Sequence, residues 1–149
     1  MGSQILVLFD PDEYAAWGGL LSTYAQMDRA VDVDLRERDG ITHTEFEVLL
    51  RLRYAPEGRM RIQELAERSI LTRSGTSRLV NRLELAGLIA REEVPGDGRG
   101  TYALLTPAGE TLFDAAAARH IAFVREHFHA RLDADDIAAL GRIWAKLAR

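Results

Sequence analysis

In the first part of the chain, apolar side chains recur at steps of three and four residues, the spacing of one helix face. Asp10 and Pro11 can begin this helix, and Gly40 can end it. Its apolar positions are Trp17, Leu20, Leu21, Tyr24, Met27, Val31 and Leu35. A capping-box sequence at residues 42–45 predicts a second helix that stops near residues 56–58.

The middle of the chain predicts two helices followed by a hairpin. Residues 63–69 predict a short helix, and residues 72–86 predict the next one, with Gly87 as its stop. The β-prone runs at residues 88–94 and 101–105 are joined by a glycine-rich loop, as in a β-hairpin. This order indicates a winged helix-turn-helix, which is suited to placing one helix in the major groove of DNA.

A pair of helices closes the chain, so the predicted fold class is mainly α (α+β). Thr106 and Pro107 can start the first of them, and Asp133 can start the second. Residues 60–62 predict a short strand. The last helix carries an apolar stripe of Ile137, Leu140, Ile143, Trp144 and Leu147. This stripe and the apolar residues 5–9 can fold onto the chain's own core or intertwine with a second copy in an isologous homodimer.

The composition indicates a globular protein of one domain. Its 149 residues, 47% of them hydrophobic and 28% charged, are enough to bury a core. No run approaches the roughly 18 apolar residues of a membrane span, and residues 5–9 are too short for a signal peptide. We therefore expect a cytoplasmic protein with no membrane partner. The absence of cysteine excludes disulfides, thiol redox sensing and cysteine-ligated zinc.

The net charge of −4 argues against a nonspecific nucleic-acid coat, because neutralising phosphates requires cations. The charge is unevenly distributed, however. Arg73, Arg78 and Arg82 lie in a stretch without an acid, which leaves −7 on the rest of the chain once their +3 is taken from the net −4. A small cationic patch on an acidic body suits specific binding better than nonspecific binding.

The helix predicted at residues 72–86 separates into two sides when successive residues are placed 100° apart. The side expected in the core holds Thr76, Leu79, Val80, Leu83 and Ala86. The polar side holds Ser74, Ser77, Arg78 and Asn81, with Arg73 near its N-terminal edge. Arg78 can pair with guanine, and Asn81 can pair with adenine or a phosphate. The alternative is an ordinary solvated face, but the adjoining hairpin favours DNA binding.

Arg99 lies in the loop of the predicted hairpin, between Gly98 and Gly100. At the tip of a wing it can enter a narrow minor groove, where A·T tracts concentrate negative potential. Asp97 is then expected to orient Arg99 or to pair with an arginine from a neighbouring element. The alternative is a hairpin turn with one exposed charge. A nucleotide-binding loop is excluded, since no G-K-[ST] follows and no helix starts there.

No pattern in the sequence predicts an enzyme, a metal site or a cofactor. The closest candidate for a metal site is the group of histidines formed by His120, His127 and His129. Two helical turns separate His120 from His127 by about 10.5 Å along the axis, too far for one ion. We interpret these histidines as solvated or capping residues.

Three motifs carry a family resemblance. They are L-T-R-S-G-T-S-R-L-V-N-R-L-E-L-A-G-L-I at residues 71–89, the wing residues Asp97 and Arg99, and L-L-T-P-A-G-E at residues 104–110. Together they resemble the MarR family of bacterial transcriptional regulators. The resemblance spans the chain, with one departure. Gly98 and Gly100 stand where the family often has charged residues, which bears on how firmly Arg99 is held.

The resemblance implies a single MarR-type domain over residues 1–149. Residues 42–106 would form the winged-helix DNA-binding lobe, and residues 1–40 and 107–149 would form dimerisation helices. Such a homodimer binds double-stranded DNA at a pseudo-palindromic operator and usually represses nearby genes. Arg99 would enter the minor groove. The recognition-helix residues would be Ser74, Ser77, Arg78 and Asn81.

Family members commonly release DNA when a small aromatic or phenolic acid binds between the dimerisation helices and the winged helix. The residues that can line such a site here are Trp17, Tyr24, Met27 and His43. A stripe of this kind at helical spacing also fits an ordinary core. The alternative function for the whole chain is a winged-helix protein-interaction module without sequence-specific DNA binding.

Overall fold

The fold is described from a computed structural model, which places residues 9–68 and 71–148. Residues 5–8 of the first apolar run, and Ser69 at the end of a predicted helix, lie outside the described residues. The chain forms two compact units, Met1–Thr44 and Glu45–Arg149, and we describe each by itself. Among the described residues, no helix has the length and apolarity that crossing a membrane requires.

The first unit consists mainly of one long helix, α1 (Pro11–Asp39). The side chain of Asp10 accepts hydrogen bonds from the backbone N–H groups of Asp12 and Glu13, and Glu13 completes a capping box. Gly40 ends the helix at φ 69°, in the left-handed region that favours glycine. Both ends predicted from the sequence are confirmed.

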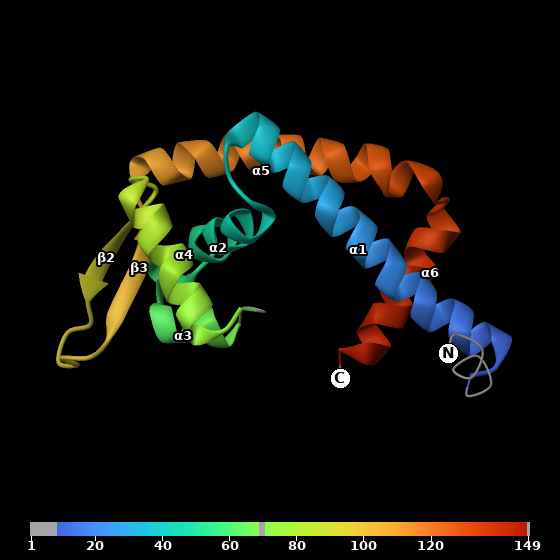
Figure 1. The fold of residues 1–149 in the computed structure, drawn as a ribbon, viewed down its shortest axis with the longest axis horizontal. Coiled ribbons are helices and arrows are strands. Elements are labelled where there is room, and N and C mark those ends of the chain that lie inside the picture. Colours follow the sequence, from blue (N-terminus) through green and yellow to red (C-terminus); the bar gives the residue numbers. More distant parts are fainter. Residues whose placement is uncertain (1–8, 69–70, 149) are drawn as a thin grey trace. The chain divides into compact units, whose positions relative to one another are not determined.

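The second unit contains a helix-turn-helix and a three-stranded sheet. In chain order, its elements are α2 (His43–Arg53, whose first two residues belong to the first unit), η2 (Pro56–Gly58), β1 (Arg59–Arg61), α3 (Ile62–Glu67), α4 (Arg73–Leu85), β2 (Ile89–Glu93), β3 (Thr101–Leu105), α5 (Pro107–His127), η3 (His129–Arg131) and α6 (Ala134–Leu147). Figure 1 shows the β2–β3 hairpin beside the helices of the helix-turn-helix. This architecture confirms the predicted mainly α (α+β) winged helix-turn-helix.

The sheet is antiparallel, with β3 between β1 and β2. Tyr102 lies opposite Arg61 on one neighbouring strand and opposite Glu92 on the other. The β2–β3 hairpin forms the wing, and its loop is the end of the wing farthest from α5 (Figure 1). Strand β1 pairs with β3 of the wing and leads directly into α3. The wing and the helix-turn-helix are therefore joined through one sheet.

The fifth helix is shorter than its apolar pattern predicts. We expected it to continue to about residue 132, but α5 ends at His127. At Phe128 the backbone turns to φ −116° and ψ −63°, and a 3-10 turn follows. Phe128 and Leu132 keep the apolar spacing of α5, although the backbone is no longer α-helical at these residues. Apolar periodicity alone therefore placed the end of the helix too late. Asp133 caps α6 through a capping box with Asp136, as predicted.

The core of the second unit forms where α2, α3, α4, α5 and the sheet contribute their apolar sides. Its most deeply buried side chains include Leu49, Leu52, Leu65, Val80, Leu83, Ala103, Phe113 and Ala116. The ring of Phe46 stacks on that of Phe113 with centroids 5.4 Å apart. This stacking ties α2 to α5.

The apolar stripes of α1 and α6 remain exposed within a single chain. On α1 they include Tyr14, Trp17, Leu20, Leu21 and Tyr24, and on α6 they include Ile137, Ile143, Trp144 and Leu147. The exposed fractions of these side chains run from 37% at Leu20 to 67% at Leu147. Two fates were predicted for the stripe of α6, and the exposure of Ile137, Ile143, Trp144 and Leu147 does not fit burial in the chain's own core.

A tight joint connects the root of the wing to α5. Thr106 caps α5 by accepting a hydrogen bond from the Gly109 N–H at 3.0 Å, and its hydroxyl donates to the Gly87 carbonyl at 2.6 Å. The Thr106 N–H donates to the Leu88 carbonyl at 3.1 Å. A Cβ at Gly109 would lie 1.9 Å from that same carbonyl oxygen, so only glycine fits at this joint.

We predict that Gly109→Ala lowers the free energy of unfolding by about 1–3 kcal/mol, because the new methyl group must displace the Leu88 carbonyl. Thermal denaturation followed by circular dichroism measures this loss. Gly98→Ala is the matched control, since a Cβ there meets nothing within 4 Å. Equal stability of the two variants would contradict the close contact at Gly109.

Candidate DNA interface

Helix α4 has one buried side and one exposed side. The buried side chains are Thr76, Leu79, Val80 and Leu83, as the helical wheel predicted. Ala86 was expected among them, but it is exposed because it lies at the C-cap, beyond the last residue of the helix. The polar residues predicted to face outward are all exposed: Arg73, Ser74, Ser77, Arg78 and Asn81.

The N-terminal half of α4 presents unpaired cations. Thr72 caps the helix, since its hydroxyl accepts a hydrogen bond from the Gly75 N–H at 3.1 Å. The hydroxyls of Thr72 and Ser74 lie 3.2 Å apart. Within the described residues, the side chains of Arg73 and Arg78 have no hydrogen-bond or ion-pair partner. Exposed guanidinium groups beside a helix N-terminus attract anions such as phosphate.

Arg82, the third arginine of this stretch, is paired within the fold. Its Nε lies 2.7 Å from Oε1 of Glu45, a buried carboxylate on α2. This ion pair joins α2 to α4. Of the three cations counted in the sequence, Arg73 and Arg78 therefore form the free positive charge of α4.

Asn81 is tied to the root of the wing. Arg91 on β2 donates a hydrogen bond from Nη2 to Oδ1 of Asn81. The Nε of Arg91 also lies 2.9 Å from Oε2 of Glu84. The sequence analysis missed Arg91, because the contact joins a helix to a strand and leaves no local pattern in the sequence.

The loop of the wing is held by its own backbone. The Val94 N–H donates to the Gly100 carbonyl at 3.0 Å, and the Gly100 N–H donates to the Asp97 carbonyl at 3.0 Å. A Cβ at Gly100 would lie 2.9 Å from Cγ2 of Val94, so this glycine permits the close turn. The backbone that carries Arg99 is therefore fixed, although its side chain is exposed and unpaired within the described residues.

Asp97 joins the loop of the wing to β1. Its Oδ1 accepts a hydrogen bond from the Arg99 N–H at 3.2 Å, and its Oδ2 lies 2.9 Å from Nη1 of Arg61. The Arg99 N–H first, and then the Arg61 guanidinium, lower the pKa of Asp97. The Asp97 side chain therefore contacts both groups expected of it: the backbone of Arg99 and an arginine of a neighbouring strand.

Arg61 was not predicted as a site residue. It occupies the N-cap of α3, where Ser, Thr, Asp or Asn is usual, and its side chain makes no capping hydrogen bond. Instead its guanidinium reaches Asp97 and lies 5.9 Å from the ring centroid of Tyr102. The hydrogen bond to Asp97 raises the pKa of Arg61. No sequence pattern indicated this role, because Arg61 was predicted within a short strand at residues 60–62 and not at a helix cap.

The residues proposed for a small ligand lie in the first unit. Trp17 and Tyr24 are 54% and 57% exposed, and Met27 is half-buried. On one helix, Trp17 and Met27 are separated by about 15 Å along the axis, so α1 alone does not bring them together.

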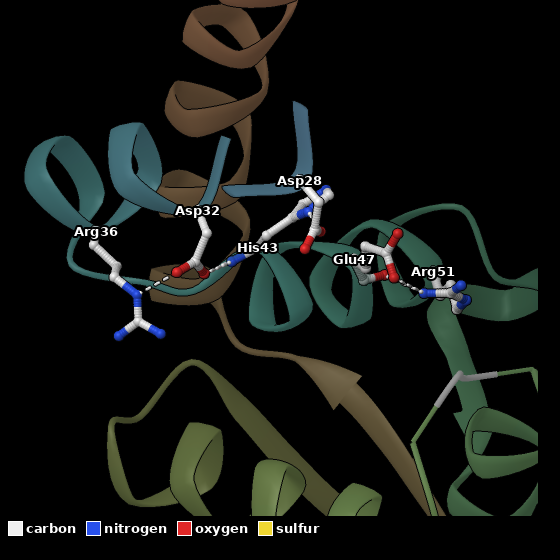
Figure 2. A network of polar contacts seen from close by, with 6 residues as sticks. All are labelled: Asp28, Asp32, Arg36, His43, Glu47 and Arg51. Atoms are coloured by element: carbon white, nitrogen blue, oxygen red, sulfur yellow. Dashed lines mark hydrogen bonds and ion pairs between the residues drawn. The ribbon is translucent and has the colours of Figure 1, made fainter. Parts of the chain in front are cut away.

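His43 belongs to a polar network (Figure 2). Its Nδ1 lies 2.7 Å from Oδ1 of Asp28, and its backbone N–H donates to Asp32 at 2.9 Å. Although burial raises the pKa of Asp32, hydrogen bonds from Arg36 and the His43 N–H outweigh it and lower that pKa. An acidic ligand at the His43 ring would meet the carboxylate of Asp28.

The three other histidines pack against aromatic rings. His120 lies 4.8 Å from the ring centroid of Phe46, and His127 stacks on Phe123 at 4.0 Å. His129 meets the ring of Phe128 edge-on at 5.4 Å. Aromatic packing therefore accounts for all three positions.

Comparisons with known proteins agree with this arrangement. The profile of the MarR family matches residues 39–100. Sco3205 of Streptomyces coelicolor, a MarR family transcriptional regulator solved in complex with DNA, is 31% identical with a TM-score of 0.86; the match covers 94% of this chain and 88% of that one. A mutant MarR from E. coli complexed with operator DNA is 25% identical with a TM-score of 0.78, over 95% of this chain and 100% of that one.

An uncharacterised HTH-type transcriptional regulator of Bacillus anthracis is 32% identical over 112 residues, 74% of this chain and 72% of the relative. These relatives are transcriptional regulators and not enzymes. The winged helix, the outward polar face of α4 and these likenesses lead to one conclusion: the chain belongs to the MarR family of DNA-binding transcriptional regulators.

Proposed function

We propose that the protein is a homodimeric repressor that binds a pseudo-palindromic operator and is released by a small aromatic or phenolic ligand. The observation that carries the DNA-binding mode is the exposed face of α4, where Arg73 and Arg78 are unpaired beside two serine hydroxyls. In this mode α4 enters the major groove, and Ser74, Ser77, Arg78 and Asn81 face the bases and phosphates. Arg99 enters the adjoining minor groove.

The exposed apolar stripes of α1 and α6 support the homodimer. Trp17 and Trp144 are 54% and 43% exposed in a single chain, and each lies within a longer apolar stripe. Large contiguous apolar surfaces are rare on monomeric proteins. An isologous dimer covers them with the same surfaces of the second copy. Two recognition helices can then meet half-sites one helical turn apart, about 34–36 Å.

The proposed ligand is a small aromatic or phenolic acid. Trp17 and Tyr24 offer exposed rings for stacking. Met27 and His43 are the other proposed contacts, and the acid group of the ligand must point away from the Asp28 carboxylate beside His43. Such a ligand releases DNA only if it binds more tightly to the dimer whose recognition helices are wrongly spaced. A ligand with equal affinity for both arrangements shifts nothing.

Footprinting on the DNA that flanks its own gene tests the proposed repressor. We expect a two-fold symmetric footprint from two chains bound at each site. Addition of a suitable phenolic acid should reduce this protection of the DNA. We also expect the logarithm of the binding constant to fall with the logarithm of the salt concentration, by about 0.9 per phosphate contacted. Binding without a defined footprint, or without this salt dependence, would favour the protein-interaction module instead.

We predict that Arg78→Ala relaxes base preference at one operator position and weakens binding by about 1–3 kcal/mol, because a bidentate contact to a base edge is lost. Titration against the operator and its single-base variants measures both effects. Arg36→Gln is the control, since Arg36 lies on α1 in an exposed ion pair with Asp32. An unchanged preference at every position in Arg78→Ala would contradict the role of Arg78.

We predict that Arg99→Ala weakens binding by about 1–3 kcal/mol at operators with A·T flanks, because a charged contact in a narrow minor groove is lost. The same substitution should weaken binding to operators with G·C flanks by less. Competition between the two kinds of operator DNA measures the difference. Arg61→Met keeps Arg99 but removes the contact of Arg61 with Asp97. Its binding affinity should lie between those of the wild type and Arg99→Ala. Equal losses on both kinds of flank would argue against minor-groove entry.

A further inference from the structure

The contact between Arg91 and Asn81 has a chemical consequence for base reading. Arg91 projects from β2 and Asn81 from the exposed side of α4, ten positions apart in the sequence. A guanidinium group only donates hydrogen bonds, so the amide atom that faces it must be the oxygen, Oδ1. The usual ambiguity between the oxygen and nitrogen of an asparagine amide is therefore resolved here.

The amide nitrogen of Asn81 remains available. Because Oδ1 and Nδ2 occupy the two branches of one planar group, Nδ2 points away from Arg91. Within the described residues, this nitrogen has no hydrogen-bond partner, and Asn81 is exposed. Asn81 therefore offers two N–H donors to solvent while its acceptor is engaged.

A second contact holds Arg91 beside Asn81. Its Nε lies 2.9 Å from Oε2 of Glu84, one turn further along α4 from Asn81. The Glu84 carboxylate offsets the charge of Arg91, and the side chain of Arg91 is only 35% exposed. Such an arginine is less available to a phosphate than Arg78, which has no partner in the described part of the chain.

The base edges of the major groove differ in donors and acceptors. Guanine presents two acceptors, N7 and O6, and thymine presents O4. Cytosine presents only a donor, and adenine presents one donor beside one acceptor. The bidentate contact of asparagine with adenine uses Oδ1 and Nδ2 side by side, so the donors of Arg91 compete with the adenine amino group for Oδ1.

We propose that Arg91 is a positioning residue that makes Asn81 a donor-only reader, which selects guanine, and thymine after it, over adenine and cytosine at one position of each half-site. This proposal rests on the proposed function, since it requires α4 to lie in the major groove. It replaces the pairing of Asn81 with adenine or a phosphate that the sequence suggested.

Selection of bound sequences from a randomised duplex library, with the full-length protein, tests the proposal. The position that loses its preference in Asn81→Ala is the one that Asn81 contacts. There the wild type should prefer guanine over adenine about fivefold or more. The protein should bind a duplex with hypoxanthine at this position as well as one with guanine, because hypoxanthine keeps N7 and O6. A duplex with 7-deazaguanine there should be bound less well.

Variants of Arg91 separate positioning from folding. In Arg91→Met the amide of Asn81 is free to turn, so adenine should gain on guanine until the two lie within about threefold. Arg91→Lys keeps a donor and should retain the preference for guanine. Arg36→Met, which removes an exposed ion pair in the first unit, is the matched control and should leave the profile unchanged.

The outcomes are distinct. Adenine preferred by the wild type, no position altered by Asn81→Ala, or an unchanged profile in a folded Arg91→Met would each overturn the proposal. The wild-type selection and the base analogues decide the matter even if Arg91→Met does not fold. If the wild type selects no sequence at all, the proposed function itself is wrong. That outcome differs from one in which only the role of Arg91 is wrong.

Discussion

Burial of the apolar side of α4 is the constraint on which the rest of the structure depends. Leu79, Val80 and Leu83 are at most 4% exposed, so the rotation of the helix about its own axis is fixed by the core. Because the opposite side must then face solvent, Ser77 and Arg78 are presented outward without any contact that holds them there. The exposed polar face of α4 is a consequence of the packing beneath it.

The sequence predicted the elements and the orientation of α4 well, since both follow from local rules. Apolar periodicity placed the helices, and side-chain caps such as Asp10, Thr72 and Asp133 marked where helices begin. Predictions failed where the backbone departs from a continuing pattern, as at Phe128, or where a residue lies just beyond an end, as Ala86 does.

The contacts that organise the site could not be predicted in the same way. Arg61 meets Asp97 across 36 positions of sequence, and Arg82 meets Glu45 across 37. Such pairs depend on strand register and on the packing of α2 against α4, which no local pattern encodes. Arg61 itself was predicted within a short strand at residues 60–62, whereas the structure places it at the N-cap of α3.

These contacts divide the arginines of the candidate DNA interface into two groups. Arg61, Arg82 and Arg91 bind carboxylates of the same unit and join its elements. The second group, Arg73, Arg78 and Arg99, is exposed and has no partner within the described residues. The paired arginines fix the backbones that carry the free ones, so less order must be imposed when DNA is bound. A chain with net charge −4 can therefore bind a polyanion through a few free cations, whose backbone positions are fixed by ion pairs of neighbouring arginines.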